Sequence, residues 1–389
     1  MALPVTLSGS AWSKQSGGGP HLVGGNVYAF FVVSGDLPTI NAFKATDPET
    51  SFSVVDTHDS GATNIRDLST VVSGTTIFVI FETATFIAIV EFDTITDTFS
   101  NNVNIESFSG GQGPSTIDLV ICDVRIRSDG DLIVLYGGDT DNVKGTAYDR
   151  VDYARREGST WTAGIAVDNA GEINWHSGGM ASGSSDRMHF FFHNHTNLDA
   201  YQRTLNSSNS LETFPSSFDT NLPSGSSLVR IVPGVSYDSA GTQKVRVPYA
   251  GLDGANIRVR IAKLDSADAP TVTSEVASDQ QQRDNPGPTS RLAADGTDLH
   301  LLYSDVSTQD IWQDTNSNDG GWGTDVEVRD AVACFKIMTN IYTRVGSVKL
   351  AFLYGSGTVI EYDEITLSAP ASLTFPSRLR NHMAALLAR

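Results

Sequence analysis

Two stretches of the sequence, SDGDLIVLY at residues 128–136 and ADGTDLHLLY at residues 294–303, decide the fold. Each opens with an Asp-Gly turn and runs into a short strand whose alternate side chains point to two faces that are both apolar. Weaker copies of the same turn and strand recur along the chain: GGNVYAFFV (24–32), SGTTIFVIF (73–81), SSDRMHFFF (184–192), SAGTQKVRVPY (239–249) and VGSVKLAFLY (345–354). The sequence is therefore built from one repeated unit.

The repeat has the length of a propeller blade. The first apolar residue of each strand serves as a marker, and the markers are Val27, Ile77, Leu132, Met188, Val245, Leu299 and Val348. Neighbouring markers lie 50, 55, 56, 57, 54 and 49 residues apart. A unit of about 50 residues with three or four short strands is typical of a β-propeller blade. We therefore predict an all-β fold, a seven-bladed β-propeller, with six or eight blades as alternatives.

The two ends of the repeat region predict how the ring closes. The last unit, Ala333 to Leu367, has residues for about three strands, whereas Pro4 to Lys14 reads as one strand without a unit of its own. We predict that this N-terminal strand completes the last blade and removes its open edge. The predicted organisation is a propeller over residues 1–367, a linker rich in Pro, Ala and Ser over 368–377, and a C-terminal helix over 378–389.

The C-terminal segment RLRNHMAALLAR has the pattern of an amphipathic helix. Ser377 is a suitable N-cap, and four apolar residues recur at helical spacing on one face: Leu379, Met383, Leu386 and Leu387. A helix of this length is not stable alone. We expect it to dock, either on its own propeller or on a partner subunit through these four residues.

Charge and composition exclude several classes of partner. The formal net charge is −19 and the sequence pI is about 4.6. So acidic a surface repels phosphates, and no nucleic-acid partner is expected. No apolar run reaches about 18 residues, so no membrane span is predicted. The N-terminus MALPVTLSGS lacks the regions of a signal peptide, which predicts synthesis in a cytoplasm without export by that route.

The sequence gives no signature of a cofactor or a metal, and none is predicted. It has no P-loop, dinucleotide fingerprint, Ser-His-Asp order or Cys-based zinc pattern. Cys122 and Cys334 each lie inside an apolar run and are interpreted as buried free thiols. His189, His193 and His195 would point to one side of an extended strand, but a complete zinc ligand set cannot be identified around them.

Arginines form the first candidate binding site. Five of them precede marker strands, in the segment expected to be innermost in each blade: Arg66, Arg125, Arg230, Arg291 and Arg344. Arg125 and Arg291 share the spacing Arg-x-x-x-Asp-Gly. Guanidinium groups facing one channel would bind a carboxylate or a sulfate in bidentate fashion. The alternative is that each arginine pairs with an acidic residue at its own turn.

Tryptophans and carboxylates leave further alternatives open. Five tryptophans lie in or near expected loops, where they either stack on sugar rings or fill gaps between blades: Trp12, Trp161, Trp175, Trp312 and Trp322. A general acid and base made of two carboxylates would need them about 5–9 Å apart. The sequence does not supply that distance.

The repeats resemble sialidase-like propellers built from BNR-type repeats. The likeness rests on DGDLIVLY, SSDRMHFFFHNHTNLDAYQRTL, DGTDLHLLYSDVSTQDIWQDT and GGWGTDVEV, and spans roughly residues 20–367. The Asp-box of that family, Ser-x-Asp-x-Gly-x-x-Trp, is incomplete in SYDSAGTQ (236–243), where Gly241 is displaced and no Trp follows. This departure argues against sialidase activity.

Two further likenesses concern function. The segment from Met188 to Tyr201 is similar to propeller polysaccharide lyases, in which a His and a Tyr act as acid and base. That resemblance implies that His193 or His195 works with Tyr201, beside an arginine that neutralises a uronate carboxylate. The acidic chain, rich in Ser, Thr, Asp and Gly and ending in a short helix, also resembles phage virion proteins in style.

Two functions of different classes follow. The sequence favours a non-enzymatic virion component of a phage tail or capsid. Such a protein would be located in the virion, anchored to other virion subunits by its C-terminal helix, and would present loops to a host glycan or a neighbouring subunit. The alternative is a carbohydrate-active enzyme, either a polysaccharide lyase or a sialidase-like glycosidase.

Overall fold

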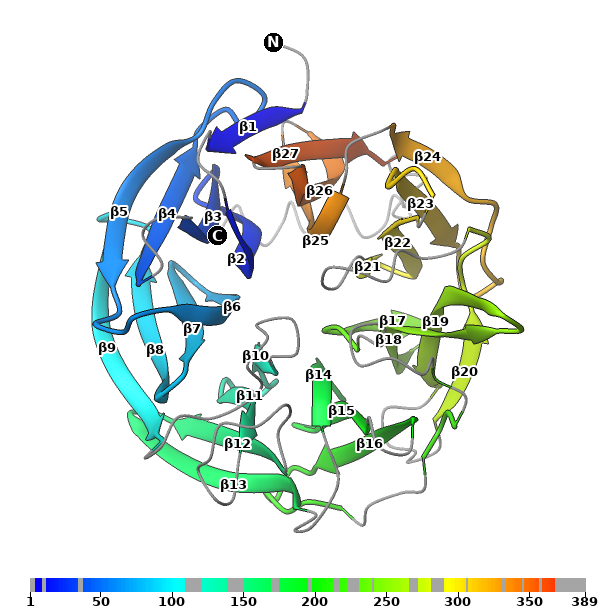
Figure 1. The fold of residues 1–389 in the computed structure, drawn as a ribbon, viewed down its shortest axis with the longest axis horizontal. Helices are drawn as coiled ribbons and strands as arrows, with labels where there is room; N and C mark the ends of the chain where they lie inside the picture. Colours follow the sequence, from blue (N-terminus) through cyan, green and yellow to red (C-terminus); the bar gives the residue numbers. More distant parts are fainter. Residues whose placement is uncertain are drawn as a thin grey trace, which may run out of the picture.

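The computed structural model is a ring of β-sheets arranged as blades around a central axis (Figure 1). It describes residues 4–8, 12–33, 38–108, 121–138, 150–168, 175–194, 198–212, 217–220, 222, 231–239, 241–265, 272–280, 290–305, 307–330, 334–344, 346–356 and 359–367. Throughout these ranges the secondary structure consists of strands and turns, without a helix. The predicted all-β, seven-bladed propeller is confirmed.

The first four blades take the chain from Trp12 to Leu205. Blade 1 contains β2 (Trp12–Val23), β3 (Asn26–Val33), β4 (Thr39–Ala45) and β5 (Ser53–Asp59). Blade 2 contains β6 (Ile65–Ser73), β7 (Thr76–Thr83), β8 (Phe86–Asp93) and β9 (Thr98–Ser107). Blade 3 contains β10 (Cys122–Ile126), β11 (Leu132–Gly138), β12 (Arg150–Glu157) and β13 (Thr160–Asp168). Blade 4 contains β14 (Trp175–Ser182), β15 (Met188–Asn194) and β16 (Asp199–Leu205).

The last three blades complete the ring. Blade 5 contains β17 (Val235–Ser239), β18 (Thr242–Asp253), β19 (Asn256–Leu264) and β20 (Thr273–Val276). Blade 6 contains β21 (Ser290–Asp295), β22 (Asp298–Ser304), β23 (Ile311–Asn316) and β24 (Val326–Arg329). Blade 7 contains β25 (Cys334–Arg344), β26 (Ser347–Ser356), β27 (Val359–Thr366) and the N-terminal β1 (Val5–Ser8). The seven sequence markers all lie on the second strand of a blade.

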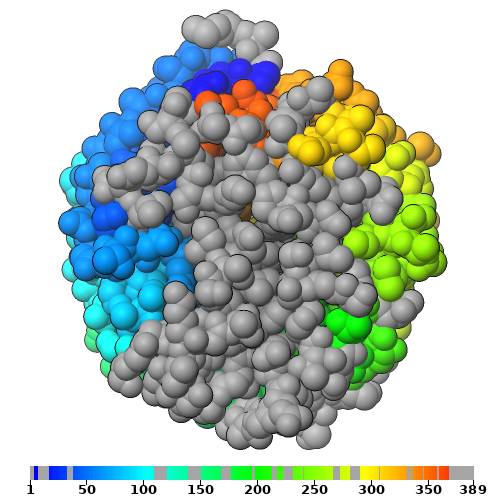
Figure 2. All heavy atoms as spheres, viewed as in Figure 1, coloured from blue at the N-terminus to red at the C-terminus, as the bar shows by residue number. Residues whose placement is uncertain are grey.

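The first strand of the chain closes the ring, as predicted. β1 pairs antiparallel with β27, with Val5 opposite Tyr362 and Thr6 opposite Glu361. Figure 2 shows the blue atoms of β1 against the red-orange atoms of β27 at the rim of the molecule. The predicted bounds, Pro4 to Lys14, were wrong, because Trp12 already begins β2. The segment therefore serves two blades, with β1 outermost in blade 7 and β2 innermost in blade 1.

The core lies between the blades, because each sheet is apolar on both faces. Every residue of β11 and of β15 is buried. Tyrosine hydroxyls then tie neighbouring blades together: Tyr28 donates to Asp97 at 2.9 Å and Tyr249 donates to Asp219 at 2.5 Å. Packing of this kind holds the innermost strands at fixed positions around the axis.

Several sequence predictions can be placed in this fold. Cys122 and Cys334 are buried free thiols, as predicted. Trp161, Trp312 and Trp322 pack against core clusters between blades, which favours the gap-filling alternative for these three. The predicted linker and helix, residues 368–389, lie outside the described residues, together with Leu379, Met383, Leu386 and Leu387. In the part of the chain that is described, no helix is long and apolar enough to cross a membrane.

Candidate functional site

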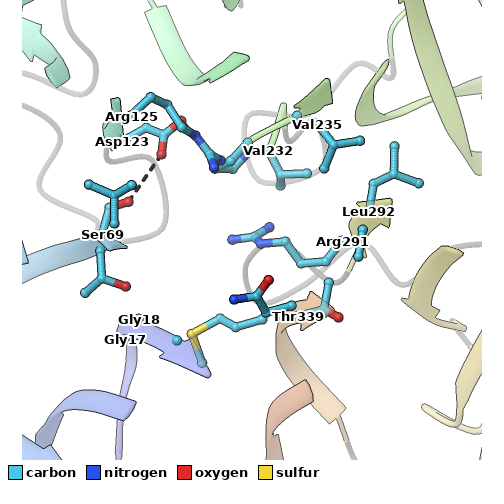
Figure 3. A pocket seen from close by; sticks show the side chains of 18 of the residues that line it. Gly17, Gly18, Ser69, Asp123, Arg125, Val232, Val235, Arg291, Leu292 and Thr339 are labelled. Atoms are coloured by element: carbon cyan, nitrogen blue, oxygen red, sulfur yellow. Dashed lines mark hydrogen bonds and ion pairs between the residues drawn. The ribbon is translucent and has the colours of Figure 1, made fainter. Parts of the chain in front are cut away.

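The innermost strands of the blades enclose a cavity at the axis of the ring. Its volume is about 490 Å³, and its walls come from β2, β6, β10, β14, β17, β21 and β25 (Figure 3). The described part of the lining contains six ionisable side chains besides the thiol of Cys122: His21, Asp67, Asp123, Arg125, Arg291 and Lys336. Side chains far apart in sequence thus converge because each blade contributes one strand to the wall.

Arg291 extends from β21 into the cavity (Figure 3). Its Nη1 donates to the backbone oxygen of Ser290 at 3.0 Å, and no carboxylate of the described residues lies within 4 Å of its guanidinium. Burial lowers the pKa of Arg291 to about 10, while Asp123 and Asp67 act in the opposite direction. An enclosed guanidinium without a carboxylate at contact distance favours the binding of an anion.

Arg125 reaches the same cavity from β10, on another side of the ring (Figure 3). Its Nε lies 3.4 Å from Oδ2 of Asp123. The Asp123 carboxylate is buried and accepts hydrogen bonds from Ser69 Oγ at 3.2 Å and from the backbone N–H of Met180 at 2.9 Å. Because Ser69 is in blade 2 and Met180 in blade 4, this carboxylate is fixed by three blades and in turn positions Arg125.

The shared spacing Arg-x-x-x-Asp-Gly does not give the two arginines equivalent places. Five residues separate the last paired residues of the β10–β11 hairpin, Ile126 and Leu132, whereas two residues separate Asp295 and Asp298 in blade 6. Arg125 is therefore opposite the residue after its marker, and Arg291 is opposite the third residue after its marker. A shift of two residues along a strand is about 7 Å, so the cavity has cations at two depths.

Lys336 and Asp67 form an ion pair within the cavity wall. The Lys336 Nζ lies 3.4 Å from Asp67 Oδ1, and it joins blade 7 to blade 2 past the innermost strand of blade 1. Asp67 Oδ1 also accepts a hydrogen bond from the backbone N–H of Leu68 at 2.8 Å. Burial raises the pKa of Asp67 and lowers that of Lys336, and the attraction between the two opposes both shifts.

His21 is the one histidine in the described lining of the cavity. Its Nε2 is 2.7 Å from Thr70 Oγ1. Thr70 can pack there because position 18 is glycine: a Cβ on Gly18 would lie 2.3 Å from the Thr70 hydroxyl oxygen. Burial and, secondly, the charge of Arg125 lower the pKa of His21 to about 4. The imidazole is therefore neutral at physiological pH and has a nitrogen lone pair that can accept a proton.

The structure brings two of the five predicted arginines, Arg125 and Arg291, to the cavity. Arg66 is buried 3.9 Å from Glu82 and does not line it. Arg344 pairs with Ser347 at the hairpin end of β25, where it contacts Glu364 and lies 2.6 Å from Glu49, away from the cavity. Arg230 lies outside the described residues. The prediction of one converging set was too broad. Arg344 lies at the end of its strand, beyond the cavity, and Arg66 does not line the cavity although the next residue, Asp67, does.

Of the predicted catalytic residues, His193 and Tyr201 do not belong to the described lining of the cavity. His193 is fully buried on β15, and Tyr201 on β16 donates from its hydroxyl to Asp199 Oδ2 at 3.1 Å. These are the second and third strands of blade 4, so they stand farther from the axis than β14. His195 is outside the described residues. The described residues contain no group of three or more His, Cys, Asp or Glu side chains that could hold a metal ion.

Sequence reasoning missed His21, Asp67 and Lys336 as residues of one site. The available signal was their place before a marker strand, on the innermost strand of blades 1, 2 and 7. Register shifts in β2, β6 and β25 weaken that signal, because each shift moves a side chain relative to a simple count from the marker.

No protein-family model matches the sequence, and no curated protein matches it. Similar solved structures include a polysaccharide lyase of family PL25, an ulvan lyase bound to -[GlcA(1-4)Rha3S]-, with a TM-score of 0.55 and 9% identity over 93% of this chain and 97% of the other. The polysaccharide lyase Uly1 follows with a TM-score of 0.50 and 10% identity, over 94% and 99% of the two chains. At this identity the likeness shows the propeller fold alone.

Proposed function

We propose that this protein is a carbohydrate-active enzyme that binds an anionic polysaccharide in the central cavity and cleaves it by β-elimination. The observation that carries the proposal is Arg291, which extends into the cavity with no carboxylate of the described residues within 4 Å. Arg291 is half-buried, and a cation partly withdrawn from water is costly unless an anion neutralises it. A uronate carboxylate has the charge and the planar shape that a guanidinium binds in bidentate fashion.

The overall charge of the chain makes this cavity unusual. The formal net charge is −19, yet the described lining carries three cationic side chains, Arg125, Arg291 and Lys336, against two carboxylates. A local positive site inside an acidic protein attracts an anion to one place and repels it elsewhere. This pattern favours a ligand that is recognised at the axis.

The lining also supplies a proton acceptor for elimination. With a uronate carboxylate held by Arg291, the charge that develops next to it is stabilised, and neutral His21 accepts the proton from C5. The electrons of that C–H bond form the C4–C5 double bond, and the C4–O bond breaks. The proton then passes from His21 to the departing oxygen, so one residue serves as base and acid.

The fold likeness supports the enzyme over the virion component. Both solved structures that reach a TM-score of 0.50 or more among those described are polysaccharide lyases, and one is bound to glucuronate linked to a sulfated rhamnose. The virion role was predicted from the C-terminal helix, which lies outside the described residues. That role remains a prediction.

The test is a cleavage assay on a panel of polysaccharides. The panel contains polymers of the -[GlcA(1-4)Rha3S]- type, other uronate polymers, and the same polymers after reduction of their carboxyl groups. We expect a uronate polymer to yield products with the ultraviolet absorbance of an unsaturated uronate, and its carboxyl-reduced form to be inert. Products without unsaturation would indicate hydrolysis in place of elimination. The absence of products from every polymer would contradict the proposal.

A further inference from the structure

We infer that the central cavity selects an anionic group with a single negative charge, and that Arg291 is the residue that binds it. The inference rests on the proposed function for the glycan that carries the group, but its charge argument and its test do not require cleavage. It follows from which charges in the cavity are already neutralised by neighbours and which are not.

Two of the three described cations in the lining have a carboxylate beside them. Lys336 Nζ is 3.4 Å from Asp67, and Arg125 Nε is 3.4 Å from Asp123. Both carboxylates are held in place by backbone donors, Asp67 by Leu68 and Asp123 by Val124 and Met180. Neither carboxylate can swing away to make room for an incoming anion without losing these hydrogen bonds.

Arg291 is the cation left over. Its Nη1 donates a hydrogen bond to the backbone oxygen of Ser290, and the side chain extends into the cavity (Figure 3). With neutral His21, the described lining therefore holds one positive charge more than negative charges. One singly charged anion brings that balance to zero.

A doubly charged anion fits this cavity poorly. Its second charge would be uncompensated in an enclosed site that already contains Asp67 and Asp123, and interactions between charges are strong where water is scarce. The groups that satisfy the inference are a carboxylate, a sulfate monoester and a phosphate diester. A phosphate monoester above its second pKa of about 6 does not satisfy it.

Two sugars of nearly the same shape test the charge rule. Glucose 6-sulfate carries one negative charge at every pH used, whereas glucose 6-phosphate changes from one charge at pH 5 to two at pH 7.5. Saturation-transfer NMR titrations would measure the affinity of each sugar for the full chain at both pH values. The sulfate corrects for titration of the protein, including Asp67, His21 and Lys336, because only the phosphate changes its own charge.

We expect the two sugars to bind with similar affinity at pH 5, and the phosphate to bind at least tenfold more weakly than the sulfate at pH 7.5. Equal affinities at pH 7.5, or no binding of either sugar at both pH values, would overturn the inference. In Arg291→Gln, binding of the sulfate should fall at least tenfold. Arg187→Gln is the matched control, because Arg187 pairs with Glu212 at 2.7 Å outside the cavity.

Failure of this inference and failure of the proposed function can be told apart. If the sugars bind as the charge inference predicts but no polysaccharide is cleaved, the anion site is supported and the proposed lyase activity is rejected. If a uronate polymer is cleaved but the phosphate binds as well as the sulfate at pH 7.5, the lyase activity is supported and the selection of a single negative charge is rejected.

Discussion

Arg291 and Arg344 occupy similar places in the sequence and opposite situations in the structure. Both lie on an innermost strand, before the marker of a blade. Arg344, at the hairpin end of β25, contacts Glu364, lies 2.6 Å from Glu49 and is 3.9 Å from Asp47. Arg291, in the wall of the central cavity, has no carboxylate within 4 Å among the described residues. One arginine is enclosed by anions of its own chain, and the other is left for an anion from outside.

The difference separates two uses of the same side chain. At the hairpin end, the charge of Arg344 compensates Glu364, whose side chain is 1% exposed, and so contributes to stability. At the axis, the charge of Arg291 contributes nothing of that kind and costs desolvation. A substitution of Arg291 should therefore lower catalytic activity, whereas a substitution of Arg344 should lower the stability of the fold.

The largest expected effect is on catalysis by Arg291→Gln. Removing the guanidinium should lower kcat/KM for a uronate polymer by about 10²–10³-fold, the range observed when one charge-stabilising donor is lost. The melting temperature should not fall, because the residue has no ion pair to lose among the described residues. A variant that keeps its activity would remove Arg291 from the site, and the Arg187→Gln control should match the unmodified chain in both assays.

Arg344→Ala should produce the reverse result. It leaves the buried Glu364 without its strongest partner and should lower the free energy of unfolding by about 3 kcal/mol. Urea denaturation would measure the loss, and kcat/KM at a temperature where the variant is folded should stay within about twofold. A large loss of activity in the folded variant would show that the hairpin end and the axis are not independent.

His21 should make stability depend on pH. Its pKa is about 4 in the folded chain and near the ordinary 6.5 in the unfolded chain. Between these values the unfolded state binds the extra proton, so this contribution to stability is complete above pH 6.5 and is lost as the pH falls towards 4. We expect a loss of about 2 kcal/mol, allowing for the partial exposure of the ring. Denaturation of His21→Asn across the same range should lack that part of the slope.

Thr70→Val should give the smallest effect and sharpen the role of His21. The substitution keeps the shape against Gly18 but removes the hydroxyl that is 2.7 Å from His21 Nε2. If Thr70 orients the imidazole, kcat should fall about tenfold, with little change in KM and with a shifted pH profile. Thr70→Ser should restore both. An unchanged pH profile would leave Thr70 with a packing role only.

The sequence predicts the fold well because the signal repeats. Seven apolar strands at nearly equal spacing each satisfy the same requirement, burial between two neighbours, so an error in one unit is corrected by the others. Ring closure was also predictable, because the last unit lacked one strand and the start of the chain had one strand to spare. The bounds of that strand were wrong because one run of residues was assigned to a single strand, whereas Val5–Ser8 pair with blade 7 and Trp12 already belongs to blade 1.

The site was only partly predictable. Arg125 and Arg291 could be found because each precedes a marker strand, in the segment expected to be innermost in its blade. Lys336 and Asp67, which meet across a third blade, are 269 residues apart, and no local pattern links them. His193 and Tyr201 were predicted as a catalytic pair because they lie in one segment, but they are on the second and third strands of their blade. Distance from the axis depends on strand order, which side-chain identity does not reveal.

The pairing of β1 with β27 also bears on how the protein is made. Val5 leaves the ribosome before its partner Tyr362, which is synthesised 357 residues later. At about 5–20 residues per second, the opening strand waits roughly 20 to 70 seconds for its partner. Through that interval the growing chain has two unpaired edges and no enclosed axis. Lys336 cannot reach Asp67 until blade 7 emerges, so the anion site forms only after the six preceding blades have been synthesised.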